Sequence, residues 1–321
     1  MRLALPAHLA AALHGSGLSV IVTGAGGWIG GATLELLADA LGPADFGRRV
    51  FAFAAQGRCR TLASGTTAAL RPLAALDELE PGRCLLLHYA FLGREKVAEM
   101  PLTHYVAANE AIGACVRRAV ARLRPRGVFL ASSGAVHGPD GALETELARN
   151  PYGALKLRDE AVFAATCRAV GASLAIGRIF NLAGPYINKL ESYALACFIR
   201  DALAGRPIAV RARRRVERSY VQVGDVVALA LSALLDPQEE VAAFETAGER
   251  VVEVGELAAL VGDLLRPGLA IERPPLDPAL GADRYVGDPA AMRALAARHR
   301  LSLEELPAQI RRTADYLAGP G

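Results

Sequence analysis

The sequence is poor in lysine and cysteine and has no long apolar run, and each shortage excludes a class of protein. Its five cysteines include no CxxC pair, which argues against a zinc site, and an odd count in a long chain argues against a disulfide scaffold. No apolar run reaches the roughly 18 residues of a membrane helix. A net charge of +3 is too small for a nucleic-acid-binding surface. We therefore predict a cytoplasmic protein with no metal site and with neither a membrane nor a nucleic acid as partner.

What is present indicates a large α/β protein. A length of 321 residues suits about two domains, and an apolar fraction of 52% supplies a large core. In the first half, short apolar runs alternate with longer alanine-rich segments, which is typical of a parallel sheet covered by helices on both faces. Strands are predicted at 18–23, 50–54, 84–88, 128–132 and 174–179, and helices at 28–41, 103–123 and 152–170.

The domain organisation is predicted from a change in the sequence pattern near residue 180. Beyond it, the alternation of strands and helices gives way to shorter elements separated by prolines. We expect a Rossmann-type doubly wound parallel sheet in residues 1–180. A smaller, mixed α/β substrate lobe is expected in residues 181–321. Residues 220–245 are expected to return to the first domain, and a short helix is expected before residue 17.

A glycine-rich turn follows the first predicted strand. Gly24, Gly27 and Gly30 give the spacing TGxxGxxG between that strand and a helix. In dinucleotide-binding folds, the first glycine permits a tight turn, the second lets a pyrophosphate approach the backbone, and the third lets the helix pack on the sheet. The helix N-terminus also offers N–H donors to an anion. The turn therefore predicts a bound dinucleotide.

The end of the second predicted strand is expected to select the cofactor. An acidic residue there would bind the ribose 2′-hydroxyl of NAD, whereas an arginine would accept the 2′-phosphate of NADP. The strand ends at Ala54 and Ala55 without an acid, and Arg58 follows closely. This favours NADP(H) over NAD(H); the alternative is that Arg58 and Arg60 are solvated surface side chains.

Tyr152 and Lys156 form a YxxxK motif on a predicted helix. Residues four apart share a helix face, so the phenol and the ammonium can point into one cleft. A nearby cation stabilises a phenolate and lowers its pKa from about 10 towards the working pH, as a general acid–base requires. With three lysines in the chain, this placement is informative. The alternative is a solvated helix face.

A pair of serines, Ser132 and Ser133, follows the strand predicted at 128–132. In parallel sheets, ligands bind beyond the carboxyl ends of the strands. A serine there would hydrogen-bond a substrate oxygen and share its proton with Tyr152. The alternative role of either hydroxyl is to cap a turn.

Together these motifs resemble those of the extended short-chain dehydrogenase/reductases, and specifically of the NAD-dependent epimerase/dehydratase family, which acts on nucleotide sugars. The likeness covers nearly the whole chain. Further stretches are similar to family motifs, namely 87–90 (HLAA-like), the helix stretch beginning at Asn109, 132–138 (SSxxVYG), 150–156 (SPYGxSK), 178–185 (RxFNxxGP) and 218–225 (R-D/S-Y/F-V-x-V-x-D). The resemblance selects Ser133 as the catalytic hydroxyl.

The resemblance also implies roles for individual residues. The cofactor would contact Gly24, Gly27, Trp28, Ile29, Gly30, Arg58, His88, Tyr89, Ala90, Asn109 and Lys156. A nucleotide-diphosphate sugar would contact Ser133, His137, Asn181 and Arg218, because an amide and a guanidinium suit paired phosphates. Arg284 is either a further substrate ligand or a surface residue, and Asp225 is expected to be a helix N-cap. The family also suggests a homodimer formed through the helices at 103–123 and 152–170.

The departures from the family narrow the reaction. Gly134 and Ala135 stand where the family's dehydratases carry an acid pair, so elimination of water lacks its acid and base. His137 replaces a tyrosine in the wall of the sugar pocket. Hydride chemistry at the sugar C4 remains, in which Tyr152 moves the hydroxyl proton, Ser133 orients the oxygen, and Lys156 lowers the pKa of Tyr152 and holds the nicotinamide ribose.

Three functions are therefore considered. The preferred one is a 4-keto-sugar reductase that uses exchangeable NADPH. The first alternative is a nucleotide-sugar 4-epimerase that keeps NAD tightly bound. The second alternative is a non-catalytic dinucleotide-binding redox sensor, although such proteins usually lose the tyrosine or the lysine that this chain retains.

Overall fold

The computed structural model describes residues 3–138, 141–236 and 241–319. The chain divides into two compact units, which are described separately. The first, called here the sheet unit, comprises the residues up to Ile179 together with Val227–Phe244. The second, called here the small unit, comprises Phe180–Val226 and the residues from Glu245 onward.

The sheet unit is built on one large, mostly parallel sheet, as the alternating pattern predicted. Within the described residues it has eight strands in the order β12-β7-β6-β5-β1-β2-β4-β3. The central strands β1, β5 and β6 are buried along their whole length, which explains their continuous apolar sequences. The strands are β1 (Ser19–Thr23), β2 (Val50–Ala54), β3 (Arg58–Thr61), β4 (Thr67–Pro72), β5 (Cys84–His88), β6 (Gly127–Ser133), β7 (Ser173–Ile179) and β12 (Val241–Thr246).

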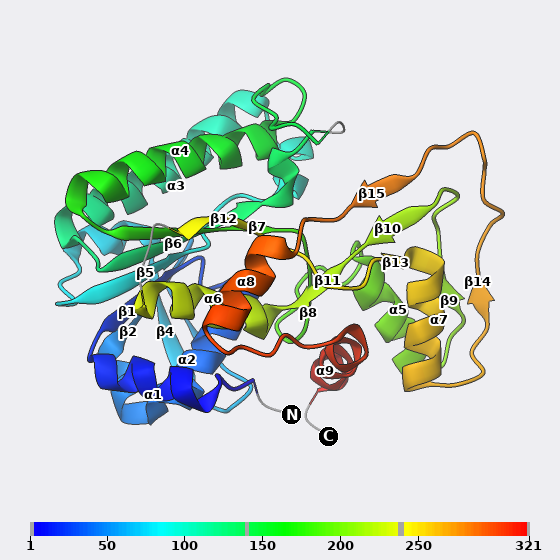
Figure 1. Ribbon diagram of the computed structural model, residues 1–321, viewed down its shortest axis with the longest axis horizontal. Helices are drawn as coiled ribbons and strands as arrows, with labels where there is room; N and C mark the ends of the chain where they lie inside the picture. Colours follow the sequence, from blue (N-terminus) through cyan, green and yellow to red (C-terminus); the bar gives the residue numbers. More distant parts are fainter. Residues whose placement is uncertain (1–2, 139–140, 237–240, 320–321) are drawn as a thin grey trace. The chain divides into compact units, whose positions relative to one another are not determined.

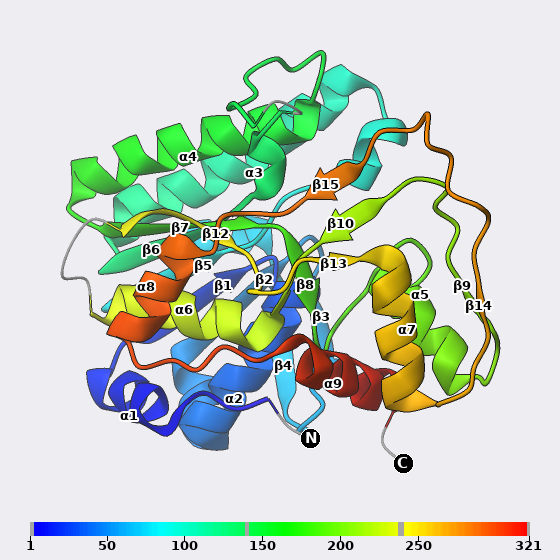
Figure 2. The same cartoon turned by 45° about the vertical axis from the view of Figure 1, so that its right-hand side comes forward.

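Helices cover both faces of this sheet (Figures 1 and 2). Helices α3 (Leu102–Leu123) and α4 (Pro151–Val170) lie on one face, and α1 (Ala7–Ser16) and α2 (Trp28–Arg49) lie on the other. Phe163 of α4 and Val116 of α3 are fully buried in one apolar cluster with Ile21 and Leu86 of the sheet. Short 3-10 helices lie at Leu73–Glu78, Arg94–Ala98 and Gly134–Val136.

The small unit has its own apolar core, formed by α5 (Ala194–Leu203), α7 (Val254–Leu265) and α9 (Leu306–Ala318) around short strands. Helix α8 (Ala290–Arg298) follows β15 (Asp283–Tyr285), and α6 (Val223–Leu235) begins here and continues into the sheet unit. The remaining strands pair as β8 (Asn181–Ala183) with β11 (Tyr220–Gln222), β9 (Ile208–Ala209) with β14 (Ile271–Glu272), and β10 (Val216–Arg218) with both β13 (Val252–Glu253) and β15.

The structure differs from the sequence-based expectation at three places. Helix α2 continues to Arg49 rather than ending at residue 41, with non-helical backbone at Gly42 (φ 70°) before Pro43. The segment after β2 forms an antiparallel hairpin, β3–β4, at the edge of the sheet. Residues 220–222 pair with β8 rather than with the large sheet, which β12 joins instead.

Within the described part of the chain, no helix combines the length and the apolar character needed to cross a membrane.

Candidate active site

The glycine turn connects β1 to α2 and lies at the carboxyl ends of the parallel strands. Gly24 has a left-handed backbone (φ 73°), and a Cβ there would lie 2.6 Å from the backbone nitrogen of Ala90. A Cβ at Gly30 would lie 2.3 Å from the carbonyl oxygen of Gly24. Both glycines are therefore required by the protein's own packing, which brings α2 and the end of β5 against the turn.

Gly27 has a different reason to be glycine. It is the N-cap of α2, has extended backbone, and provides no side-chain cap. A Cβ there would meet only the Gly24 carbonyl oxygen, at 3.4 Å, which is an ordinary contact. Packing therefore does not require this glycine, and its hydrogen leaves the outer face of the turn open to an approaching group. First-turn amides of a helix have no acceptor within it, so the turn fits the pyrophosphate of a dinucleotide.

Two arginines of β3 lie beside this turn. Residues two apart in a strand share a face, and the Arg58 Nη2 lies 3.1 Å from the Cβ position of Gly26. The Arg60 Nη1 donates to the carbonyl oxygens of Ala25 (3.1 Å) and Gly27 (3.4 Å). Arg60 thus braces the turn. Arg58 is exposed, and its side chain forms no ion pair or hydrogen bond with the residues that the structure describes.

The other residues predicted to bind the cofactor support the turn from within the sheet unit. His88 is buried, its Nδ1 hydrogen-bonds the Thr23 hydroxyl at 2.7 Å, and burial lowers its pKa to about 3, with the charges of Lys156 and Arg117 adding to the effect. Burial also raises the pKa of Tyr89, which shares a hydrogen bond with Thr33.

Asn109 on α3 is also buried and is bonded within the protein. Its Oδ1 accepts from the backbone nitrogen of Leu92 at 2.8 Å, and its Nδ2 donates to the Tyr105 carbonyl at 3.2 Å. The side chain therefore holds the segment that follows β5, including Phe91.

The start of α4 brings Tyr152 to Ser133. Asn150 caps the helix by accepting from the Gly153 amide at 3.0 Å, and its Nδ2 donates to the Ala135 carbonyl at 2.7 Å. A Cβ on Gly153 would lie 1.9 Å from that carbonyl oxygen, so glycine permits this close approach. Ser133 ends β6 and hydrogen-bonds the Tyr152 side chain. The structure thus places two of the three predicted catalytic residues, Ser133 and Tyr152, within hydrogen-bonding distance of each other.

Lys156 lies one turn further along α4 and is buried. Its Nζ donates to the Ala131 carbonyl of β6 at 2.7 Å and lies 3.9 Å from the centre of the Phe91 ring. Burial lowers the pKa of Lys156 to about 8, against the opposing charges of Asp159 and Glu160. The ring of Phe91 also makes an edge contact with Tyr152, at 5.6 Å between centroids.

The prediction that Lys156 lowers the pKa of Tyr152 is wrong for this structure. Burial raises the pKa of Tyr152, and the hydrogen bond with Ser133 opposes that rise. The Nζ of Lys156 is hydrogen-bonded to the Ala131 carbonyl and lies over the Phe91 ring, whereas the phenol is hydrogen-bonded to Ser133. The phenol is therefore protonated at neutral pH.

Sequence reasoning missed two features here. Phe91, between Tyr152 and Lys156, carried no signal, since it lies in an irregular segment after β5. Glu160 could have been found from the sequence, because it follows Lys156 by four residues and so lies on the same helix face. Glu160 is buried and accepts from Ser132 (2.5 Å) and from Arg178.

His137 lies in the irregular segment that follows β6. Its Nδ1 is 3.0 Å from the Gly141 carbonyl oxygen, and its backbone forms an isolated bridge with Leu143. The ring is therefore held within its own loop.

The small unit holds three of the five residues predicted to bind a substrate, namely Asn181, Arg218 and Arg284, whereas Ser133 and His137 belong to the sheet unit. The Asn181 Nδ2 donates to the Tyr285 carbonyl at 3.1 Å, and the Arg218 guanidinium bonds the Asp283 side chain at 2.9 Å and lies 6.0 Å from the centre of the Tyr285 ring. Arg284 is exposed and pairs with Glu217 at 2.6 Å. All three therefore lie on or beside the paired strands β10 and β15.

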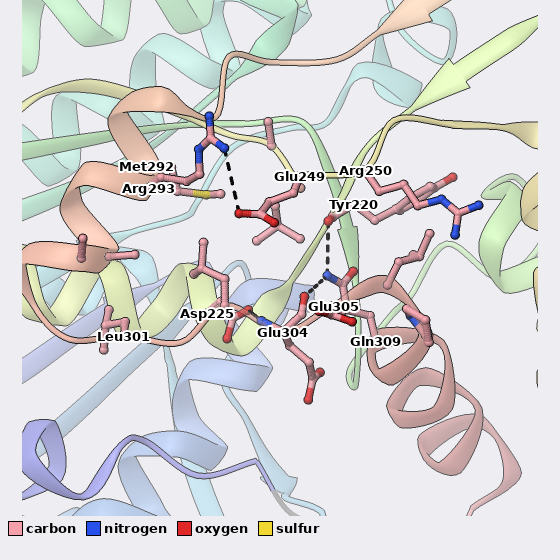
Figure 3. A pocket seen from close by; sticks show the side chains of 18 residues that line it. Tyr220, Asp225, Glu249, Arg250, Met292, Arg293, Leu301, Glu304, Glu305 and Gln309 are labelled. Carbon is pink, nitrogen blue, oxygen red and sulfur yellow. Dashed lines mark hydrogen bonds and ion pairs between the residues drawn. The ribbon is translucent and has the colours of Figure 1, made fainter.

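A cavity of about 570 Å³ in the small unit lies elsewhere, between α8, α9 and β11 (Figure 3). Asp225 lines it and is not the N-cap of α6, since that helix begins at Val223. Its carboxylate instead accepts from the backbone nitrogen of Glu304 at 2.8 Å. Burial raises the pKa of Asp225 to about 7.

A comparison with models of known protein families shows which family this chain belongs to. The family model described as the NAD dependent epimerase/dehydratase family matches residues 20–245. The chain belongs to this family. The match confirms the resemblance drawn from the motifs, and it makes this family member an enzyme of the short-chain dehydrogenase/reductase type.

Solved structures of nucleotide-sugar 4-epimerases share the fold of this family member. The UDP-N-acetylglucosamine 4-epimerase of Methanobrevibacter ruminantium, solved with UDP-N-acetylmuramic acid, is 18% identical with a TM-score of 0.73, over 94% of this chain and 98% of that one. The UDP-glucose 4-epimerase of Thermus thermophilus, solved with NAD, is 22% identical with a TM-score of 0.69, over 94% and 99%. No curated protein sequence matches the chain.

Proposed function

We propose that this enzyme is an NADP(H)-dependent oxidoreductase that acts at C4 of a nucleotide sugar and reduces a 4-keto group. The observation that carries the proposal is the hydrogen-bonded pair of Ser133 and Tyr152 at the end of β6, with Lys156 one turn along the same helix. A protonated phenol that bonds a serine hydroxyl is suited to donate a proton to a ketone oxygen.

The residues of the chain divide the work as follows. Ser133 orients the substrate oxygen, and Tyr152 gives it a proton. Lys156 holds a positive charge on the same helix face, where it would contact a nicotinamide ribose. When bound, the dinucleotide would supply the hydride. The glycine turn and the first-turn amides of α2, at Trp28, Ile29 and Gly30, would hold its pyrophosphate.

The preference for NADP(H) rests on Arg58. Its guanidinium is exposed beside Gly26, whereas Arg60 is engaged with the turn. β2 ends at Ala54 with no carboxylate to bind a 2′-hydroxyl. A 2′-phosphate would give Arg58 a charge-assisted partner. His88, Tyr89 and Asn109 bond protein groups, so we propose that they shape the cofactor site, with the Ala90 backbone beside the turn.

The substrate would be a nucleotide-diphosphate sugar. Asn181 and Arg218, each oriented by a partner within the small unit, would contact the diphosphate. Arg284 is mostly exposed and paired with Glu217, which favours the surface role over a substrate contact. The small unit would then be the substrate lobe and the sheet unit the dinucleotide-binding domain.

A homodimer through α3 and α4 is proposed as well. A cavity of about 300 Å³ is lined by residues of both helices, among them Ala114, Arg117 and Arg158, and by Phe91 of the segment after β5. Val162 of α4, which also lines it, is 40% exposed. A second copy of the chain would cover this face. Light scattering of the purified protein gives the mass that tests it.

The second candidate function is 4-epimerisation, which the similar solved structures of 4-epimerases favour. One experiment separates the two. Purified enzyme is mixed with NADPH and a 4-keto-6-deoxy nucleotide sugar, and the reduced-nicotinamide absorbance is followed. A loss of absorbance supports the reductase. Tightly bound NAD in protein purified without added cofactor, with no consumption of NADPH, supports the epimerase.

A further inference from the structure

Glu160 forms a buried junction between three elements of the sheet unit. Its carboxylate accepts the Ser132 hydroxyl of β6 at 2.5 Å. It also accepts two bonds from Arg178 of β7, at 3.0 Å from Nε and 2.9 Å from Nη2. Such a two-pronged contact fixes both distance and orientation. Since α4 carries Glu160, the carboxylate fastens this helix to the ends of two neighbouring strands.

The junction adjoins both halves of the proposed catalytic group. Ser132 immediately precedes Ser133 and pairs in register with Arg178. On α4, Tyr152, Lys156 and Glu160 are spaced by four residues and share one face. A shift of α4 relative to β6 would therefore separate Tyr152 from Ser133 and draw Lys156 from the Ala131 carbonyl.

The charges around Lys156 also involve this carboxylate. The charges that act on Lys156 are the carboxylates of Asp159 and Glu160 on its own helix. Lys156 in turn acts, together with Arg117 of α3, on His88 of β5, and Tyr152 lies one turn earlier on the same helix face. Arg178 of β7 pairs with Glu160. His88 is neutral, since burial and the charges of Lys156 and Arg117 hold its pKa at about 3. The two carboxylates alone favour the charged form of Lys156.

We propose that Glu160 is a positioning residue, which aligns the end of β6 with α4 and serves as a counter-charge to Lys156. The catalytic part of this inference rests on the proposed function. The counter-charge part does not, because it concerns the protein alone.

Three variants separate position from charge. Glu160→Gln removes the charge and weakens both contacts, so it is expected to reduce kcat by roughly 10- to 100-fold, since small misplacements of catalytic groups have effects of this size. It should also move the alkaline limb of the pH–rate profile to lower pH. Ser132→Ala leaves the carboxylate and Arg178 in place, and should reduce kcat without moving that limb. Asp159→Asn should move the alkaline limb of the pH–rate profile to lower pH, while kcat near pH 6 stays as in the wild type.

The second measurement needs no substrate. The chain has three lysines, so protein labelled with carbon-13 at the lysine ε-carbon gives few NMR signals, and Lys96→Arg and Lys189→Arg assign them. The titration midpoint of Lys156 should be lower in Glu160→Gln and in Asp159→Asn than in the wild type, and unchanged in Ser132→Ala.

The outcomes are distinct. A folded Glu160→Gln variant with wild-type kcat and an unmoved Lys156 midpoint overturns the proposal. If that variant does not fold, an unchanged kcat in Ser132→Ala overturns the positioning role. If the wild-type enzyme turns over no nucleotide sugar, the proposed function fails, and the lysine titration still decides whether Glu160 is the counter-charge.

Discussion

At the scale of single residues, the site combines a protonated phenol with a buried ammonium, and the two have different hydrogen-bond partners. Tyr152 is bonded to Ser133, while Lys156 is directed at the Ala131 carbonyl and the Phe91 ring. The spacing of Tyr152 and Lys156 was readable from the sequence because helix geometry fixes it. The direction of the ammonium was not, because it depends on Phe91, which lies outside any regular element.

Tyr152→Phe tests the proton donor. The change removes only the hydroxyl, so the edge contact with Phe91 and the fold should persist. We expect kcat to fall by roughly 10²- to 10⁴-fold, the usual contribution of general acid–base catalysis. Steady-state rates with NADPH measure it, and Tyr316→Phe in α9 is the matched control. Equal rates in the wild type and Tyr152→Phe would contradict the assignment, and no turnover in either would indicate the redox sensor.

Arg58→Ala tests the choice of cofactor. If the exposed guanidinium binds the 2′-phosphate, its removal should raise the KM for NADPH by roughly 10-fold or more. That factor corresponds to the loss of a charge-assisted contact that contributes about 1.5 kcal/mol to binding. The KM for NADH should stay constant, because NADH has no 2′-phosphate. Arg83→Ala is the control, because Arg83 is exposed and lies just before the amino end of β5, away from the glycine turn. A parallel change for both cofactors would count against a role for Arg58 in selectivity.

At the scale of elements, the alternation of apolar runs and helical segments was sufficient to predict the central sheet. β1, β2 and β5 match the expected ranges or differ by one residue, because strands buried on both faces carry continuous apolar sequences. The hairpin of β3 and β4 was not predicted, because β3 is short, mostly exposed and polar. Such an edge strand is defined by its partner more than by its own sequence, and it places Arg58 and Arg60 at the turn.

Gly153→Ala tests how closely α4 must approach the end of β6. The new Cβ would lie 1.9 Å from the Ala135 carbonyl oxygen, so the helix start must move and separate Tyr152 from Ser133. We expect both the melting temperature and kcat to fall. The control is Gly47→Ala in α2, which is exposed with open space around its Cβ position. There alanine should stabilise the helix by ~0.5–1 kcal/mol. Retention of full activity by Gly153→Ala would show that the contact is dispensable.

At the scale of the whole molecule, the proposed chemistry and one pH-dependent contribution to stability lie in different units. The proposed proton-transfer group lies in the sheet unit, whereas the small unit contains a half-buried carboxylate that has no part in the proposed reaction. Asp225 lines the cavity of Figure 3, accepts from the Glu304 amide, and has a pKa of about 7 because it is buried. The pH dependence of stability should therefore be separable from that of turnover.

The sign of the stability effect follows from the raised pKa. Between the ordinary value of 3.8 and the folded value of about 7, the folded state binds more protons than the unfolded state. The contribution of Asp225 is therefore most favourable below this window and is lost as pH rises through 7. Asp225→Asn retains an acceptor for the Glu304 amide without a buried charge, so its melting temperature should match the wild type near pH 4 and exceed it at pH 8. Thermal unfolding at both values measures this, and a difference that shrank with rising pH would contradict the burial of this charge.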